Sequence, residues 1–456
     1  MGKLFGTDGV RGLANVELTP ELAFKLGRAG AYVLTKTGRR APKIIVGTDT
    51  RRSCGMLSCA LTAGMCSVGA DVYSAGVIPT PGVAYLVRKY QLDAGVVISA
   101  SHNPMQDNGI KFFNSEGYKL PDALEDEIEG VIETGLDDLP RPSGADVGSQ
   151  IMCDKALDDY IAFLRSTADT RLDGMIIALD CGNGATFEAA PYLFSHMGAK
   201  VLPLNNDPDG KNINAGCGST HMEPLMEFVR KNKADVGIAF DGDGDRCLMV
   251  DERGGLVQGD EIMSICGNIM KDERRLKQDT IVATVMSNLG LTLMGEARGI
   301  NIVQTKVGDR YVLEKMLESG YSFGGEQSGH IIFLDHTTTG DGILTALQML
   351  LVMKKTGKTL SQLNTYMTVL PQVLVNARVA NEKKYDYLKH PGIQAEIKAL
   401  ESKFAGSADG TPSAGRVLIR PSGTEPVVRV MLEGRKQAVL QREAKRLAAM
   451  LEELFG

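Results

Sequence analysis

Three aspartates, Asp241, Asp243 and Asp245, alternate with glycines directly after the apolar run of residues 236–240. Glycine at the two intervening positions lets the three carboxylates converge without side chains between them. Carboxylates held this close repel one another, and each raises the pKa of its neighbours. A hard divalent cation removes that cost, because Mg²⁺ and Ca²⁺ prefer oxygen ligands. The loop therefore predicts a metal site formed by the three aspartates.

Two other interpretations of this loop are a solvated acidic turn and a calcium loop of the helix-loop-helix kind. The calcium loop would place Glu252 at its twelfth position. It also requires glycine at the sixth position, where Arg246 stands, and a helix afterwards. Residues 247–250 (Cys-Leu-Met-Val) are instead typical of a strand. A metal site between two strands is therefore favoured.

Ser101 follows another apolar run. Residues 96–98 (Val-Val-Ile) predict a buried strand, and the chain then becomes small and polar up to Pro104. Ser101 thus lies just past a strand end, where open α/β sheets bind their ligands. A serine in such a place is also a common turn former. Taken alone, the segment leaves both a nucleophile and a turn residue open.

Four motifs occur in a fixed order along the chain. They are Ser99-Ala-Ser-His-Asn-Pro104, Asp241-Gly-Asp-Gly-Asp-Arg246, Gly324-Gly-Glu-Gln-Ser-Gly-His330 and Arg420-Pro-Ser-Gly-Thr-Glu-Pro426. In these motifs the chain resembles the α-D-phosphohexomutase family, and the resemblance spans essentially its whole length. The opening Phe5-Gly-Thr-Asp-Gly-Val-Arg-Gly12 and Gln327 point to the members that act on glucosamine phosphates.

The resemblance implies an isomerase of amino-sugar metabolism that interconverts glucosamine 6-phosphate and glucosamine 1-phosphate. The reaction would pass through a phosphoserine enzyme and a sugar 1,6-bisphosphate. The resemblance also implies a Mg²⁺ ion in each chain, glucosamine or glucose 1,6-bisphosphate as activator, and a homodimer. The alternatives are a phosphoglucomutase or phosphomannomutase of the same family, a Mg²⁺-dependent sugar phosphatase, and a non-catalytic calcium-binding or sugar-sensing module.

The same resemblance gives the catalytic residues their roles. Ser101 would carry the phosphoryl group and add a phosphate oxygen to the three aspartates around the metal. His102 would orient the phosphate or bond the backbone. Lys111 and Arg11 are the proton-transfer candidates. A lysine acts as a base only where nearby positive charge and burial lower its pKa, whereas an arginine stays protonated, so Arg11 is expected to supply charge.

Substrate contacts are implied in two further motifs. Glu326 and Ser328 would bind sugar hydroxyls, and His330 would orient the substrate, transfer a proton or only pack before the next strand. Lys306 and Arg310 are lower-ranked phosphate contacts. The last motif would hold the phosphate that is not transferred in an anion nest. Its members are Arg420, Ser422, Gly423, Thr424 and Arg429.

The composition is that of an ordinary globular protein. Of 456 residues, 43% are hydrophobic and 23% are charged, and the net charge of −6 argues against a general nucleic-acid surface. No apolar run approaches the length of about 18 residues that a membrane span needs, and no signal-peptide core is visible. The eight cysteines form no Cys-x-x-Cys pair. We expect a cytoplasmic protein that binds small sugar phosphates, with neither nucleic acid nor membrane as a partner.

Strand-like runs alternate with amphipathic helices along most of the chain, which predicts an α/β fold with mixed sheets. Strands are expected at residues 43–46, 96–98, 175–180, 200–204, 280–285, 300–305, 373–379 and 416–419. With the resemblance, the pattern predicts three related α/β domains and a smaller C-terminal α+β domain around a central cleft. The domains would span residues 1–150 with the phosphoserine loop, 151–253 with the metal loop, 254–370 with the sugar loop, and 371–456 with the phosphate loop.

Overall fold

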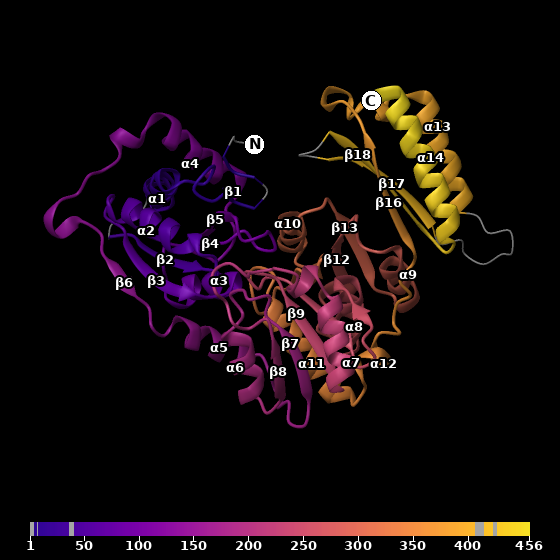
Figure 1. Ribbon diagram of the computed structural model, residues 1–456, viewed down its shortest axis with the longest axis horizontal. Helices are drawn as coiled ribbons and strands as arrows, with labels where there is room; N and C mark the ends of the chain where they lie inside the picture. Colours follow the sequence, from indigo (N-terminus) through magenta and orange to yellow (C-terminus); the bar gives the residue numbers. More distant parts are fainter. Residues whose placement is uncertain (1–3, 7, 36–40, 406–414, 423–425) are drawn as a thin grey trace. The chain divides into compact units, whose positions relative to one another are not determined.

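A computed structural model describes residues 4–6, 8–35, 41–405, 415–422 and 426–456 (Figure 1). Contacts divide the chain into two compact units. The first unit contains Met1–Met286 and Ile302–Tyr366, and the second contains Ser287–Asn301 and Met367–Gly456. Within the described ranges, no helix is long and apolar enough to cross a bilayer.

The first sheet of the first unit has six strands in the order β1-β5-β4-β2-β3-β6. Their bounds are β1 Val10–Leu13, β2 Lys43–Thr48, β3 Asp71–Val77, β4 Ala94–Ile98, β5 Asp107–Asn114 and β6 Gln150–Met152. β4, β2, β3 and β6 run parallel, whereas β5 is antiparallel to both β4 and β1. All five residues of β4 are buried, as the apolar run predicts. Ser101 therefore lies just beyond the carboxyl end of a central strand.

The helices around this sheet are α1 Pro20–Thr35, α2 Ser53–Cys66, α3 Thr80–Lys89 and α4 Asp122–Thr134. Two glycines let α1 and α2 pack closely. A Cβ on Gly27 would lie 2.3 Å from the carbonyl oxygen of Leu61, and one on Gly64 would lie 2.2 Å from that of Phe24. This packing holds the C-terminal half of α2 against α1. Pro81 stands in the first turn of α3, where its fixed φ suits a helix start.

The second sheet has five strands in the order β11-β10-β9-β7-β8. Their bounds are β7 Ile176–Asp180, β8 Lys200–Leu204, β9 Val236–Phe240, β10 Cys247–Asp251 and β11 Leu256–Val257, and the accompanying helices are α5 Ala156–Ser166, α6 Ala189–His196 and α7 Glu223–Asn232. β9 and β10 are antiparallel, with Phe240 opposite Cys247. The loop with the three aspartates is therefore the connection of a β-hairpin, which confirms the strand predicted after it.

The third sheet has the order β13-β12-β14-β15. Its strands are β12 Thr280–Thr284, β13 Asn301–Thr305, β14 Phe323–Gly325 and β15 Ile331–Phe333, and the neighbouring helices of the first unit are α8 Gly259–Asp272, α10 Asp309–Ser319, α11 Gly342–Thr356 and α12 Leu360–Leu363. β14 is parallel to β12 and antiparallel to β15. The motif that contains Glu326 thus forms the turn between β14 and β15.

The second unit contains a three-stranded antiparallel sheet in the order β16-β18-β17. Its elements are β16 Gln372–Arg378, β17 Gly415–Pro421, β18 Val427–Gly434, α9 Leu289–Arg298, α13 Pro391–Ala405 and α14 Gln437–Phe455. α13 and α14 lie side by side along the sheet (Figure 1). The buried carboxylate of Glu433 accepts hydrogen bonds from the amide of Leu289 (3.0 Å) and from Nε of Arg416 (2.5 Å). These bonds join α9 to the C-terminal sheet.

α9 connects β12 to β13, and its two ends are well defined. Asn288 supplies the N-cap, because its Oδ1 accepts a hydrogen bond of 3.0 Å from the amide of Gly290. Gly299 ends the helix in the left-handed conformation.

Candidate active site

Ser101 has a backbone conformation that is unusual for serine. Its φ of +52° lies in the left-handed region, which residues other than glycine rarely adopt. The residue is 1% exposed. Its hydroxyl donates a hydrogen bond of 2.6 Å to Oδ2 of Asp241, 140 residues further along the chain. The structure thus brings the predicted nucleophile and the predicted metal loop together.

The three aspartates of the hairpin loop form one buried cluster. One ligand oxygen from each of Asp241, Asp243 and Asp245 lies within 4.8 Å of the others. Burial, reinforced by the two neighbouring carboxylates, raises the pKa of Asp241 well above its usual value. Oδ1 of Asp243 and Oδ1 of Asp245 are buried and have no hydrogen-bond partner among the described residues. Buried carboxylate oxygens without a hydrogen-bond partner are suitable ligands for a hard divalent cation.

Lys111 on β5 reaches the same cluster. Its Nζ lies 2.9 Å from Oδ2 of Asp243 and 2.9 Å from Oδ2 of Asp8, and its side chain is buried. Burial favours the neutral amine, but the carboxylates of Asp243 and Asp8 outweigh it, so the pKa of Lys111 is raised. Lys111 could act as a base only with a lowered pKa, and this arrangement raises its pKa instead.

Asp8 forms ion pairs with three basic side chains. Asp8 was not identified as a site residue from the sequence. Its carboxylate pairs with Arg11, with Lys111, and at 2.6 Å with Nζ of Lys119. Burial would raise the pKa of Asp8, but Lys111, Lys119 and Arg11 hold it well below the usual value. Asp8 therefore keeps Arg11 and Lys111 together. The sequence signal that could have identified Asp8 was its position between Gly6 and Arg11 in the opening motif.

His102 contacts Arg246 and the hydroxyl of Ser101. Nη1 of Arg246 lies 2.8 Å from Nδ1 of His102, which is 3.3 Å from Oγ of Ser101. Burial, and then the positive charges of Arg246 and Arg11, lower the pKa of His102 to about 4. The imidazole is therefore neutral at physiological pH, and its Nδ1 accepts a hydrogen bond from Arg246. Of the two predicted contacts, phosphate and backbone, this position beside Oγ favours the phosphate.

Glu326 and Ser328 lie in the turn between β14 and β15. Oε1 of Glu326 accepts a hydrogen bond of 3.2 Å from the amide of Gly308, and the hydroxyl of Ser328 lies 3.5 Å from Oε2 of Glu326. Ser328 is exposed and Glu326 is half-buried. Both predicted sugar-binding side chains are thus accessible and adjacent.

His330, from the same motif, has a different environment because only 2% of it is exposed. Its Nδ1 lies 3.5 Å from Oδ2 of Asp245, and its Nε2 accepts a hydrogen bond of 3.1 Å from the amide of Gly340. Burial would lower the pKa of His330, but the carboxylates of Asp245 and Asp309 raise it. His330 therefore supports the metal loop, unlike the accessible Glu326 and Ser328.

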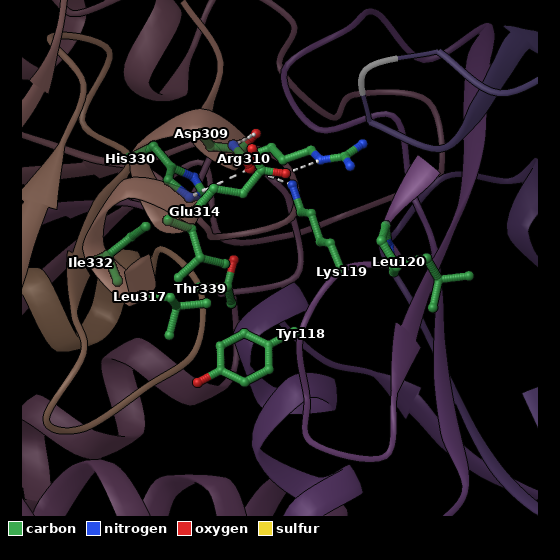
Figure 2. Close-up of a pocket in the computed structure, with 12 residues that line it drawn as sticks. Tyr118, Lys119, Leu120, Asp309, Arg310, Glu314, Leu317, His330, Ile332 and Thr339 are labelled. Atoms are coloured by element: carbon green, nitrogen blue, oxygen red, sulfur yellow. Dashed lines mark hydrogen bonds and ion pairs between the residues drawn. The ribbon is translucent and has the colours of Figure 1, made fainter. Parts of the chain in front are cut away.

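A cavity of about 130 Å³ lies beside His330 (Figure 2). Residues 118–121 after β5 and residues of α10 line it. Figure 2 shows Lys119 reaching toward Asp309, with which it forms an ion pair. Arg310 pairs with Asp122 and, at 2.8 Å, with Oε1 of Glu314. These ion pairs connect the segment after β5 and α4 to α10. Arg310, which was predicted as a lower-ranked phosphate contact, forms its ion pairs with two carboxylates.

In the second unit, Arg420 and Arg429 stand opposite each other on β17 and β18. Burial, and then the charge of Arg429, lower the pKa of Arg420. The carbonyl of Ser422 accepts a hydrogen bond of 2.9 Å from Nζ of Lys384. Neighbouring guanidinium groups favour an anion between or beside them. Gly423 and Thr424 lie outside the described residues.

Four stretches of the chain match the four parts of one family. Residues 2–138, 158–255 and 258–369 match the alpha/beta/alpha domains I, II and III of phosphoglucomutase/phosphomannomutase, and residues 374–450 match its C-terminal domain. The chain belongs to this phosphohexomutase family. The resemblance inferred from the four motifs is thereby confirmed, as is the predicted α/β fold class with a separate C-terminal domain.

Several curated relatives match over nearly their whole length. The phosphoglucosamine mutase of Ruminiclostridium cellulolyticum is 59% identical over 452 residues, which cover 99% of both chains. Those of Clostridium novyi and Acetivibrio thermocellus are 58% and 57% identical, with 99% and 100% of each chain covered.

Solved structures share the fold at lower identity. A phosphoglucomutase/phosphomannomutase family protein from Burkholderia thailandensis is 24% identical, with a TM-score of 0.81 over 100% of this chain and 99% of that one. The N-acetylphosphoglucosamine mutase of Aspergillus fumigatus, solved with GlcNAc-6P and magnesium, is 18% identical, with a TM-score of 0.65 over 99% and 96%. Phosphohexomutases are metal-dependent, and the three buried aspartates fit such a requirement.

Proposed function

We propose that the protein interconverts glucosamine 6-phosphate and glucosamine 1-phosphate, the activity for which its curated relatives are named. The observation that carries the mechanism is the hydrogen bond from the buried hydroxyl of Ser101 to Asp241. It supports the proposal because the Ser101 oxygen lies against a carboxylate cluster that could bind a cation. Phosphoryl transfer needs such positioning and charge neutralisation more than any other help.

Asp241, Asp243 and Asp245 would hold Mg²⁺, together with a phosphate oxygen on Ser101. The ion, when bound, withdraws negative charge from the phosphoryl group and eases the approach of a hydroxyl. Arg246 lies within 4.0 Å of Asp241 and holds neutral His102 beside Oγ of Ser101. The chain therefore surrounds the phosphoryl group with hydrogen-bond donors and charge before substrate binds.

In the first half-reaction a free hydroxyl of the sugar phosphate attacks the phosphorus on Ser101. The new bond joins phosphorus to the sugar oxygen, the bond from phosphorus to Oγ breaks, and Oγ keeps its electron pair. The sugar hydroxyl loses a proton and Oγ gains one, so the step balances. The other phosphate of the resulting 1,6-bisphosphate then returns to Ser101. Free glucosamine or glucose 1,6-bisphosphate would load the serine in the same way.

Lys111 and Arg11 are proposed to manage the proton of the sugar hydroxyl. Arg11 supplies charge. Lys111 can accept a proton only when the negative charge of Asp8 and Asp243 is offset. Glu326 and Ser328 are proposed to bind the sugar, and His330 to orient it through the metal loop. Arg420, Ser422, Gly423, Thr424 and Arg429 are proposed to hold the second phosphate.

A mutase assay with separate sugars tests the substrate. Purified protein with Mg²⁺ and a trace of glucose 1,6-bisphosphate receives glucosamine, glucose or mannose 1-phosphate. Faster formation of the 6-phosphate from glucosamine 1-phosphate is expected. Preference for glucose or mannose phosphate would indicate a phosphoglucomutase or a phosphomannomutase. Release of free phosphate would indicate a phosphatase. Failure of Ser101 to take phosphate, seen by intact mass, would contradict the mechanism.

A homodimer and a cytoplasmic location remain predictions. Light scattering on the purified full chain measures the first, because the mass per particle is either 49.0 kDa or a multiple of it. Fractionation of the source cells measures the second.

A further inference from the structure

The conformation of Ser101 needs an explanation that its own sequence does not supply. A left-handed φ is unfavourable for serine, because Cβ crowds the following carbonyl oxygen. Such a conformation persists where the surroundings impose it, often at functional sites. The side-chain hydrogen bonds that impose it here come from two loops, neither of which belongs to the motifs that identify the family.

Arg51 makes the first of these contacts from the loop between β2 and α2. Its side chain is fully buried. Nη2 donates to the carbonyl oxygens of Ser101 (3.1 Å) and Asn103 (2.6 Å). Nη1 pairs with Asp49, which also accepts a hydrogen bond of 2.5 Å from the hydroxyl of Ser99. One planar guanidinium therefore ties the carbonyls of the serine loop to a buried carboxylate.

Asn214 makes the second contact from a loop of the second sheet. Its Nδ2 donates to the same two carbonyl oxygens, at 2.9 Å from that of Ser101 and 3.0 Å from that of Asn103. The side chain is buried, and the residue is held by a hydrogen bond of 2.9 Å from its amide to the carbonyl of Gly182. Two donors that lie 163 residues apart thus converge on one pair of carbonyls.

A third contact closes the space around the Ser101 carbonyl. A Cβ added to Gly242, between Asp241 and Asp243, would lie 2.5 Å from that carbonyl oxygen and 2.9 Å from Nδ2 of Asn214. The metal loop therefore packs directly against the serine loop. If the carbonyls of Ser101 and Asn103 lost these contacts, we expect the φ of Ser101 to return to an ordinary negative value. The hydroxyl of Ser101 would then turn away from Asp241.

We propose that Arg51 and Asn214 are positioning residues for phosphoryl transfer. They hold the carbonyls of Ser101 and Asn103, so that Oγ faces Asp241 whether or not it carries phosphate. This inference rests on the proposed function, because it concerns the same serine. It matters most in the phosphorylated state, because the backbone must hold the phosphate close to the three aspartates that would share the ion with it.

The test measures one transfer to Ser101. Dephosphorylated protein is mixed with excess glucose 1,6-bisphosphate and Mg²⁺, quenched at short times, and analysed by intact mass. Arg51→Lys keeps a charge but loses the fork that spans Asp49 and both carbonyls. Asn214→Ala removes only the second donor. We expect about 100-fold slower transfer in Arg51→Lys, which is the usual cost of a small misplacement of reacting groups, and a smaller loss in Asn214→Ala. KM for the sugar phosphate should stay near that of the wild type.

Matched controls separate positioning from general stability. Arg28 on α1 is 6% exposed, and Asn268 on α8 is fully buried and donates a hydrogen bond of 2.8 Å to the carbonyl of Ser264 in its own helix. Neither side chain hydrogen-bonds to the serine loop within the described residues, so Arg28→Lys and Asn268→Ala should transfer phosphate at the wild-type rate per folded molecule. The folded fraction of each variant is measured by thermal unfolding, and rates are normalised to it.

Wild-type rates in both variants would overturn the inference, and so would losses that match the fall in folded fraction. A rise in KM with an unchanged transfer rate would overturn it too, since that would place the two residues in substrate binding. Wild-type protein that takes no phosphate from the bisphosphate would instead refute the proposed function, which distinguishes the two failures.

Discussion

The serine site of the first unit and the arginine pair of the second unit handle charge in opposite ways. Around Ser101, carboxylates and cations are buried together and neutralise one another, as in the contacts of Asp8 and Asp243 with Lys111. On β17 and β18, Arg420 and Arg429 face each other with like charge. The first arrangement suits a site that must hold a cation and a phosphoryl group in fixed geometry. The second places two like charges opposite each other, which suits the proposed binding of a phosphate.

Ser101→Ala should give the largest effect. Without Oγ there is no phosphoryl carrier, so mutase activity should fall by several orders of magnitude, and intact mass should show no added phosphate after incubation with glucose 1,6-bisphosphate. Ser115→Ala, at an exposed serine, is the control and should retain both. If Ser101→Ala kept turnover close to that of the wild type, Ser101 would not carry the phosphoryl group. The contrast between the serine site and the arginine pair would then have no functional meaning.

Asp243→Asn tests whether the buried carboxylates select a cation. Loss of a ligand carboxylate should weaken Mg²⁺ binding by more than about 10-fold, beyond the cost of disturbing an outer-shell partner. Titration calorimetry on the full chain measures it, and Asp154→Asn, at an exposed aspartate, is the control. EDTA should abolish wild-type activity, and Mg²⁺ should restore it. Unchanged affinity in Asp243→Asn would place the ion elsewhere.

Arg420→Ala sharpens the contrast between the regions. A charged hydrogen bond to phosphate contributes about 1.5–3 kcal/mol, so KM for the sugar phosphate should rise about 10- to 100-fold. Phosphorylation of Ser101 by bisphosphate and Mg²⁺ affinity should change far less than KM. Arg435→Ala, at an exposed arginine of the same unit, is the control. A loss of Mg²⁺ affinity in Arg420→Ala would mean that the two regions are not functionally separate.

Asp341→Asn should have the smallest effect, seen only in the dependence of stability on pH. Burial raises the pKa of Asp341, which caps α11 and accepts a hydrogen bond from Tyr160, to about 7. The folded state therefore binds more protons than the unfolded state between about pH 4 and 7, and this group's contribution to stability falls as pH rises through that range. One such group contributes a slope of at most about 1.4 kcal/mol per pH unit.

Chemical denaturation at pH 5, 6 and 7 measures that slope, and Asp341→Asn should flatten it. Glu443→Gln in the second unit is the control. Cations including Lys403 and Arg442 lower the pKa of Glu443 to about 2, so it stays ionised in both states above pH 5. An unchanged slope in Asp341→Asn would show that the buried carboxyl is not protonated in the folded state.

The sequence was sufficient for features that depend on local pattern. An apolar run followed by small polar residues placed Ser101 at a strand end, and aspartates spaced by glycine placed the metal loop between β9 and β10. The motif order gave the family. These signals are local, because strand periodicity and turn chemistry act over a few residues.

Features set by tertiary packing were missed. Arg51 and Asn214 carry no motif, and their shared target is visible only once two loops 163 residues apart are brought together. Lys119 and Asp309 pair across 190 residues. The pKa of Lys111 was expected to be lowered if it acts as a base, but its direction depends on Asp8 and Asp243, whose positions relative to it the sequence does not give. For His330 the sequence left three roles open, namely orienting the substrate, transferring a proton and packing, and only the fold shows that the side chain is buried.

The hairpin that carries the aspartates constrains the length of its loop as well as its composition. Phe240 and Cys247 are paired across β9 and β10, and four further pairs follow. If a changed loop length slipped β10 by one position, every side chain of that strand would turn to the opposite face of the sheet. Insertion scanning should therefore find this loop sensitive to changes in length as well as to substitution of Gly242, where a Cβ would lie 2.5 Å from the carbonyl oxygen of Ser101. The spacing of the three aspartates that we propose as metal ligands is therefore set by the two strands that flank them.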